Sequence, residues 1–190
     1  MTLKLILAAA LALTAGAAAP KRGKPMTTAE KSKFYSFEMK DNAGKARKLG
    51  DYKGQVLLVV NTASKCGLTP QYKGLEEVYQ KYKGKGFAVA AFPANEFGAQ
   101  EPGSDAEIKN FCALNYKTTF DLYSKIVVKG PNIHPLYAYL TKESPFTGDI
   151  GWNFAKFLIA KDGTVAARFD PKVEPNSPEI VKKVEELLAN

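Results

Sequence analysis

The sequence has few residues of the kinds that bind metals or form structural bridges. Its 190 residues include two cysteines, one histidine and one tryptophan. Cys66, Cys112 and His134 lie far apart in the chain, so no metal-ligand spacing is present. Cys66 opens the segment CGLT instead of a CxxC pair, which excludes a simple dithiol oxidoreductase. We therefore expect no metal and no cofactor.

Long runs of one charge are also missing. The formal net charge is +8, yet the longest basic blocks are pairs such as Lys21-Arg22 and Lys182-Lys183. No aromatic-basic motif accompanies them, so a solvated positive surface is favoured over a nucleic-acid partner. A weak contact with a membrane surface or an acidic partner protein stays open.

The amino-terminal segment has the pattern of a cleaved secretory signal. In residues 1–19 one lysine is followed by an apolar stretch and then by small residues. The apolar part is shorter than the roughly 20 residues that span a bilayer. We predict an exported protein, periplasmic or secreted, with a signal peptide at 1–19, a flexible leader at 20–33 and a single domain at 34–190. An oxidising compartment makes a structural disulfide the first alternative for the cysteines.

Apolar patterns predict the strands of this domain. Uninterrupted apolar runs are typical of central parallel strands, whereas alternation around a turn signal is typical of a hairpin. The Lys161-Asp162-Gly163-Thr164 segment is such a signal. The sequence predicts buried strands at residues 55–61 and 87–92, an N-terminal hairpin within 34–49, and a second hairpin from 154–160 and 165–169.

Helical spacing and capping residues predict the helices. Ser104 followed by Glu107 is a capping box, and the helix that it opens carries Ile108, Phe111 and Cys112 on one face. The predicted helices cover residues 70–82, the segment from 104 onward, residues 134–140 and the segment from 177 onward. This order predicts an α/β fold with a mixed central sheet flanked by helices.

Cys66 falls between a predicted central strand and the following helix. Ligands bind in open α/β sheets at such positions. Free backbone N–H groups near the helix start favour thiolate over thiol, and Lys65 adds positive charge. The residues alone leave three readings open: a nucleophile, half of a structural disulfide, or a small buried side chain.

Three ordered segments carry a family resemblance. NTASKCGLTPQY, FPANEFGAQEPGS and WNFAKFLI begin at Asn61, Phe92 and Trp152. They resemble the signature segments of the glutathione peroxidase family, and the resemblance covers residues 34–188. It implies a thioredoxin-like fold and the reduction of hydrogen peroxide and organic or lipid hydroperoxides.

The resemblance also implies a four-residue site. Cys66 matches the peroxidatic cysteine, and Gln100, Trp152 and Asn153 match the residues that complete the family's site. Amide and indole N–H groups can donate hydrogen bonds to a thiolate and to peroxide oxygens without titrating. Taken singly, Trp152 would read as a core anchor, Gln100 as a loop residue and Asn153 as a polar residue at a strand edge.

Cys112 resembles the resolving cysteine of family members that use thioredoxin. This implies a Cys66–Cys112 disulfide, recycled by a thioredoxin-like reductant, with glutathione less favoured. The disulfide needs Cα atoms within roughly 7 Å, so we expect the Ser104 helix to unwind in part. The alternative is that Cys112 is a buried small hydrophobe.

Departures from the family pattern refine the expectations. Ala94 replaces another cysteine of many relatives, whereas Glu96 and Thr62 replace a glutamine and a valine. The chain is short between Glu143 and Gly151, where tetrameric, glutathione-using family members carry an additional loop, so the resemblance implies a monomer with an open active-site face. His134 could be the base of a Cys–His hydrolase, but a structural role is favoured.

Three functions compete at this point. The leading one is a peroxidase that reduces hydroperoxides through Cys66. The second is a redox sensor or relay that passes its oxidation to a client protein. The third is an inert domain with a Cys66–Cys112 bridge, which would not react with peroxide.

Overall fold

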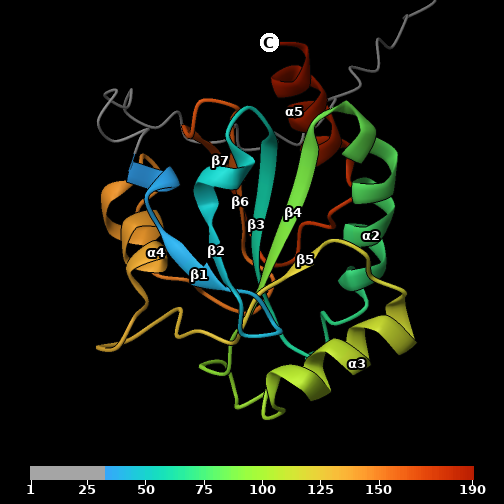
Figure 1. Ribbon diagram of the computed structural model, residues 1–190, viewed down its shortest axis with the longest axis vertical. Coiled ribbons are helices and arrows are strands. Elements are labelled where there is room, and N and C mark those ends of the chain that lie inside the picture. Colours follow the sequence, from blue (N-terminus) through green and yellow to red (C-terminus); the bar gives the residue numbers. More distant parts are fainter. Residues whose placement is uncertain (1–32) are drawn as a thin grey trace, which may run out of the picture.

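A five-stranded sheet runs through residues 33–190, the part of the chain described by this computed structural model (Figure 1). The strands lie in the order β5-β4-β3-β6-β7. Their bounds are Val56–Thr62 (β3), Phe87–Pro93 (β4), Asp121–Leu122 (β5), Lys156–Ile159 (β6) and Val165–Phe169 (β7). β3 pairs in parallel with β4 and antiparallel with β6, so the predicted mixed sheet is confirmed. The two-residue edge strand β5 was missed.

Helices cover both faces of the sheet. The longer ones are α2 (Gln71–Tyr82), α3 (Asp105–Tyr116) and α5 (Pro178–Ala189), and all three pack on one face. The other face is covered by α4 (Pro135–Ala138) and by the hairpin of β1 (Glu38–Lys40) and β2 (Ala46–Lys48). Short turns of 3₁₀ or π helix are η1 (Leu49–Tyr52), η2 (Lys83–Lys85) and η3 (Tyr139–Glu143).

The side chains of β3 explain why the sheet has two cores. Leu57 and Val59 point into the core beneath α4, whereas Leu58 and Val60 point into the core beneath α2. Successive strand residues face opposite sides, and every residue of β3 is buried. This accounts for the uninterrupted apolar run, which lacks the polar alternation of a half-exposed strand.

The predicted capping and turn signals are confirmed. Ser104 Oγ accepts from the Glu107 N–H at 3.3 Å, and Glu107 Oε2 accepts from the Ser104 N–H at 2.7 Å, which completes the capping box of α3. Ser177 caps α5 in the same position. Gly163 adopts a left-handed φ of 86° in the hairpin between β6 and β7. Pro70 lies one residue before α2, at its N-cap.

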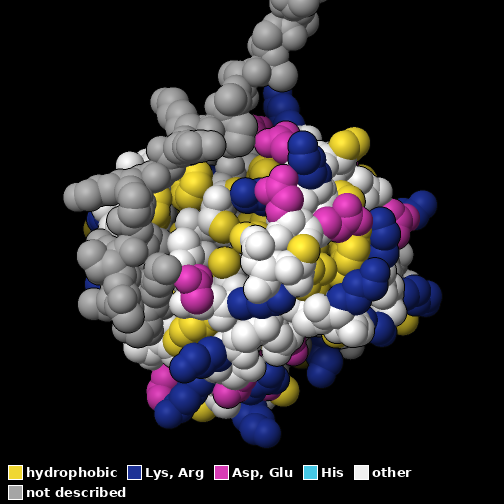
Figure 2. All heavy atoms as spheres, turned by 90° about the horizontal axis from the view of Figure 1, so that it is seen from above, with side chains coloured by type: hydrophobic (Ala, Val, Ile, Leu, Met, Phe, Trp, Pro, Cys, Tyr) yellow, Lys and Arg dark blue, Asp and Glu magenta, His cyan; other side chains and the backbone are white. Residues whose placement is uncertain are grey.

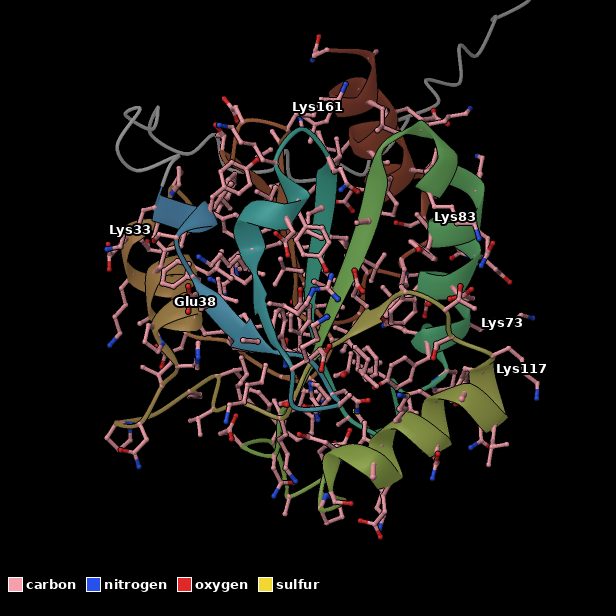
Figure 3. The ribbon with its side chains drawn as sticks, in the orientation of Figure 1. Lys33, Glu38, Lys73, Lys83, Lys117 and Lys161 are labelled. Carbon is pink, nitrogen blue, oxygen red and sulfur yellow. The ribbon has the colours of Figure 1, made fainter. Side chains whose placement is uncertain are left out.

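Charges of both signs lie together on one face of the described residues. Lys and Arg side chains are interspersed with Asp and Glu on the face seen in Figure 2. Lys73, Lys83 and Lys117 point outward along α2 and the end of α3 (Figure 3). No helix among the described residues has the length and apolar character needed to cross a bilayer. The predicted signal peptide, and all but the last residue of the predicted leader, lie outside the described residues.

Candidate active site

The sheet topology brings three separate chain segments to one edge. β3 and β4 are parallel, so their carboxyl ends lie side by side, and the antiparallel β6 begins at the same edge. Cys66 follows β3, Gln100 follows β4, and Trp152 and Asn153 precede β6. This arrangement places the four predicted site residues in neighbouring loops below the sheet in Figure 1.

Cys66 lies in a tight loop just before α2. Its side chain is buried, with 7% exposed. The Leu68 N–H donates to Cys66 Sγ at 3.4 Å. The Cys66 N–H donates to Thr69 Oγ1 at 3.0 Å, and that hydroxyl donates to the Ala63 carbonyl at 2.9 Å. Thr69 therefore fixes the loop that holds the sulfur, a role that sequence reasoning missed.

Gln100 is connected to the segments on both sides of it. Its backbone carbonyl accepts from the N–H of Lys65, the neighbour of Cys66, at 3.0 Å. Its side-chain oxygen Oε1 accepts from Asn153 Nδ2 at 3.0 Å. Gly98 precedes it with a left-handed φ of 65°, and a Cβ atom there would lie 3.6 Å from the Gln100 side chain. The turn therefore aims the amide at Asn153.

Trp152 and Asn153 have different environments. Asn153 is fully buried, whereas Trp152 is 41% exposed and its ring lies 5.7 Å from that of Phe97. Asn61, at the end of β3, donates from Nδ2 to the Trp152 carbonyl at 3.2 Å and accepts from the Phe154 N–H at 2.6 Å. Asn61 thus holds the Trp152 segment from both sides. Sequence reasoning quoted Asn61 only as part of a motif and missed this role.

Glu101 adds a buried carboxyl group next to Gln100. Only 1% of the residue is exposed, and Oε2 accepts from Ser64 Oγ at 3.1 Å. Burial raises the pKa of this carboxyl, whereas the Ser64 hydrogen bond and the charge of Lys125 act in the opposite direction. Glu96, one of the departures from the family pattern, accepts from the Val128 N–H at 2.8 Å, a structural contact.

Cys112 is buried on α3, as its helical spacing predicted. Only Ile108 and Cys112 are buried residues of this helix. Cys112 belongs to the same apolar cluster as Cys66, and both are free thiols. Burial raises the pKa of the Cys112 thiol to about 11, an effect that the neighbouring Tyr72 partly offsets. In this form the second thiol is enclosed and protonated.

His134 has the structural role that was favoured for it. Its Nδ1 accepts from the Leu136 N–H at 3.2 Å and caps α4. Burial lowers the pKa of the imidazole, which keeps Nδ1 available as an acceptor. A ring nitrogen engaged in this cap is not placed as the base of a Cys–His pair.

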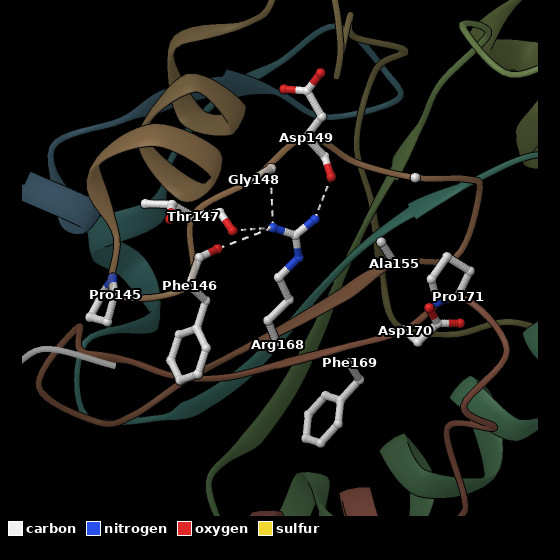
Figure 4. Close-up of a pocket in the computed structure, with 11 residues that line it drawn as sticks. Pro145, Phe146, Thr147, Gly148, Asp149, Ala155, Arg168, Phe169, Asp170 and Pro171 are labelled. Carbon is white, nitrogen blue, oxygen red and sulfur yellow. Dashed lines mark hydrogen bonds between the residues drawn. The ribbon is translucent and has the colours of Figure 1, made fainter. Parts of the chain in front are cut away.

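The short segment before Gly151 encloses a cavity of about 630 Å³ with the end of β7 (Figure 4). Arg168 donates to the carbonyls of Phe146, Thr147, Gly148 and Asp149 at 2.6 to 3.2 Å. One guanidinium group thus orders the whole turn. Both terminal nitrogens of the guanidinium donate to carbonyls, so Arg168 fixes the loop.

The geometry defines the class of the protein. A cysteine at the carboxyl end of the central strand, with side-chain amides on the adjacent loops, indicates a cysteine-dependent oxidoreductase of thioredoxin-like fold.

Comparison with known proteins narrows this class. Residues 34–141 match the model of the family described as glutathione peroxidase. A hydroperoxy fatty acid reductase of Synechocystis sp. is 46% identical over 171 residues, covering 86% of this chain and 100% of that protein. Glutathione peroxidase-like peroxiredoxin 2 of Saccharomyces cerevisiae is 48% identical over 160 residues, covering 82% and 97%. The crystal structure of Trgpx in apo form aligns with a TM-score of 0.68 and 42% identity, over 83% of this chain and 95% of that one.

This chain belongs to the glutathione peroxidase family. It is a peroxidase with a thioredoxin-like fold, and both predictions from the sequence are confirmed.

Proposed function

We propose that Cys66 is the peroxidatic residue and that Gln100, Trp152 and Asn153 bind and activate the hydroperoxide. The observation that carries this proposal is the hydrogen bond from Asn153 Nδ2 to Gln100 Oε1. Because Oε1 is engaged, the Nε2 group of Gln100 keeps its two N–H donors for the reacting atoms. The indole N–H of the half-exposed Trp152 is a third non-titrating donor.

The first step is an attack of the Cys66 thiolate on one peroxide oxygen. The S–O bond forms as the O–O bond breaks, and the leaving oxygen takes a proton to become water or an alcohol. Cys66 is oxidised to a sulfenic acid while the hydroperoxide is reduced. N–H donors aimed at the oxygens stabilise the charge that develops on the leaving oxygen.

Cys112 is proposed as the resolving residue. Its sulfur attacks the sulfenic acid of Cys66, which forms the disulfide and releases water. Both thiols are free in this form, and the bond requires the two sulfur atoms to meet. Because α3 buries only Ile108 and Cys112, it is the element that can open at low cost.

A thioredoxin-like dithiol is the proposed reductant. Its two thiols reduce the Cys66–Cys112 disulfide and become a disulfide themselves, so electrons balance over the cycle. The Saccharomyces cerevisiae relative with 48% identity is called a peroxiredoxin, which supports this choice over glutathione.

Organic hydroperoxides, including those of fatty acids, are the proposed substrates beside hydrogen peroxide. The Synechocystis relative is named for the reduction of hydroperoxy fatty acids. Trp152, within the proposed site, is one of two large apolar side chains exposed among the described residues, the other being Leu114 on α3. Such a surface suits an acyl chain next to the reacting oxygen.

We also propose that the protein acts as an exported monomer. The signal pattern of residues 1–19 supports export to the periplasm or beyond, and the short loop before Gly151 supports a monomer with an open site. The positive net charge supports a weak contact with anionic membrane surfaces.

A peroxidase assay tests this proposal. Wild type, Cys66→Ser and Cys112→Ser are compared with hydrogen peroxide or a fatty acid hydroperoxide, and with thioredoxin plus its reductase or glutathione as reductant. We expect no peroxide reaction in Cys66→Ser. In Cys112→Ser, Cys66 should still be oxidised once, but turnover with thioredoxin should be lost. Full turnover of that variant would refute the resolving role, and wild-type oxidation without recycling would favour a redox relay.

A further inference from the structure

Lys156 is a fully buried lysine at the start of β6, three residues after Asn153. Its Nζ donates to the carbonyls of Phe154 at 2.8 Å, Pro171 at 3.2 Å and Val173 at 2.7 Å. An ammonium group has three N–H bonds, so these carbonyls match its donors one to one. Burying such a group costs free energy unless its hydrogen bonds are satisfied. Forming a β-strand does not by itself require a buried lysine.

One of the three carbonyl groups that Lys156 binds belongs to Phe154, whose backbone is strained. Phe154 has a φ of 69°, a left-handed backbone conformation that is strained for a bulky residue. Such a conformation persists only where its surroundings fix it. Here the Phe154 N–H donates to the Asn61 carbonyl at 2.6 Å, and Lys156 holds the other side of the residue. The turn at Phe154 determines how the segment of Trp152 and Asn153 leads into β6.

We propose that Lys156 is a positioning residue for the peroxidase site, which fixes the left-handed turn at Phe154 and thereby the directions of Trp152 and Asn153. This inference rests on the proposed roles of those two residues. Lys156 itself does not act on the hydroperoxide. Its effect reaches the indole of Trp152 and the amide of Asn153 through the carbonyl group of Phe154.

Burial removes water from around the ammonium group of Lys156, which disfavours its charged form. It lowers the pKa of Lys156 to about 7, against the raising effect of the carboxylates of Glu174 and Asp170. The three carbonyls therefore supply the hydrogen bonds that water would provide to an exposed ammonium group. The contact with Phe154 is maintained by the buried position of the stem as well as by the charge.

Gln71 provides a matched control. It is also buried, and its Nε2 donates to the same Pro171 carbonyl at 2.8 Å. Gln71 has no hydrogen bond to Phe154, so Gln71→Met removes a buried donor from Pro171 and leaves the strained turn held. Lys156→Met removes the donor to the carbonyls of Phe154, Pro171 and Val173. Gln71→Met accounts for the loss at Pro171, so an effect seen only in Lys156→Met comes from the contacts with Phe154 and Val173.

The test uses the full chain with both cysteines reduced. Trp152 is the only tryptophan, so intrinsic fluorescence reports its surroundings directly. We expect a shifted emission maximum in Lys156→Met and an oxidation of Cys66 by hydrogen peroxide that is about 10- to 100-fold slower. Gln71→Met should keep the wild-type emission and rate. Lys156→Gln, whose shorter amide can still donate to a nearby carbonyl, should fall between Lys156→Met and wild type.

Each outcome decides the inference. A folded Lys156→Met with wild-type emission and rate would overturn it, and so would a Gln71→Met with an equal loss. If Lys156→Met does not fold, Lys156→Gln is judged on the same readouts. If neither folds while Gln71→Met does, Lys156 serves stability alone and the positioning role is rejected. A wild-type protein that does not react with peroxide would refute the proposed function, whereas the emission comparison would still test the placement of Trp152.

Discussion

Asn153 donates a side-chain hydrogen bond of 3.0 Å to Gln100, although the two residues precede and follow different strands. The contact joins the loop after β4 to the segment before β6. It also determines which end of the Gln100 amide is free, because Oε1 is the accepting atom. The amide N–H groups of Gln100 are thereby oriented in advance, and donors oriented in advance are what the role proposed for Gln100 requires.

Removal of this contact should slow the peroxide step. In Asn153→Ala the Gln100 amide loses its partner and is free to rotate. We expect the rate constant for Cys66 oxidation to fall about 100-fold, the effect of removing one preorganised donor. Stopped-flow fluorescence of Trp152 after mixing with peroxide measures it. Asn190→Ala, at the exposed carboxyl terminus, is the control, and an unchanged rate in a folded Asn153→Ala would contradict the role of the pair.

The two cysteines should differ in reactivity before oxidation. With a pKa of about 11, only about one in a thousand Cys112 side chains is a thiolate at pH 8, and the group is enclosed under α3. Iodoacetamide reacts with the thiolate, so it should modify Cys66 and spare Cys112 in the native reduced protein. Mass spectrometry of the tryptic peptides 66–73 and 110–117 measures both. Equal labelling of the two would show that α3 opens freely without oxidation.

The capping box of α3 should set the rate of disulfide formation. Ser104→Ala removes a cap worth about 1 kcal/mol, which raises the population of an opened helix about fivefold. If Cys112 reaches Cys66 through this opening, the disulfide should form up to about fivefold faster after a peroxide pulse. Ser177→Ala removes the equivalent cap from α5, which carries no cysteine, and is the matched control. Acceleration in both variants, or in neither, would argue against opening at α3.

His134 should make stability depend on pH. The neutral imidazole caps α4, and burial lowers the pKa of His134 below its ordinary value of about 6.5. The unfolded chain therefore binds the proton more tightly, so this contribution is present above pH 6.5 and is lost as the pH falls through the native pKa. Urea unfolding between pH 5 and 7 should show this loss in wild type. It should be smaller in His134→Asp, whose carboxylate caps the helix without gaining a proton in this range. Equal pH slopes would disprove the cap, and NMR titration of the single histidine gives the pKa directly.

Local sequence signals predicted much of the fold because local physics decides those elements. The apolar run of β3 requires burial on both faces, and the Ser104 and Ser177 caps begin helices wherever the chain continues in helical spacing. The placement of Cys66 after a central strand followed from the same reasoning. The roles of Gln100, Trp152 and Asn153 came from the family resemblance, because an isolated amide or indole carries no pattern of its own.

Other features depend on partners distant in sequence. β5 has two residues, too few for periodicity, and is a strand only because β4 pairs with it. Lys156 reads as an ordinary polar residue in a strand, and its burial depends on the carbonyls of Pro171 and Val173. Asn61 is a similar case, because its partners Trp152, Phe154 and Ala155 lie more than 90 positions further along the chain. The roles of such residues can be recognised only in the folded structure.

The loops at the ends of the strands opposite Cys66 offer a place to attach the protein to a support. The turn at residues 161–164 joins β6 to β7, and its Lys161 lies at the end of the molecule opposite α3 (Figure 3). The Gly54 N–H donates to the Lys161 carbonyl at 3.0 Å, which keeps this turn close to the start of β3. A tag or surface linker inserted there would direct the loops of Cys66, Gln100 and Trp152 toward solution. Attachment at one end of the sheet would thus leave the site loops at the other end accessible.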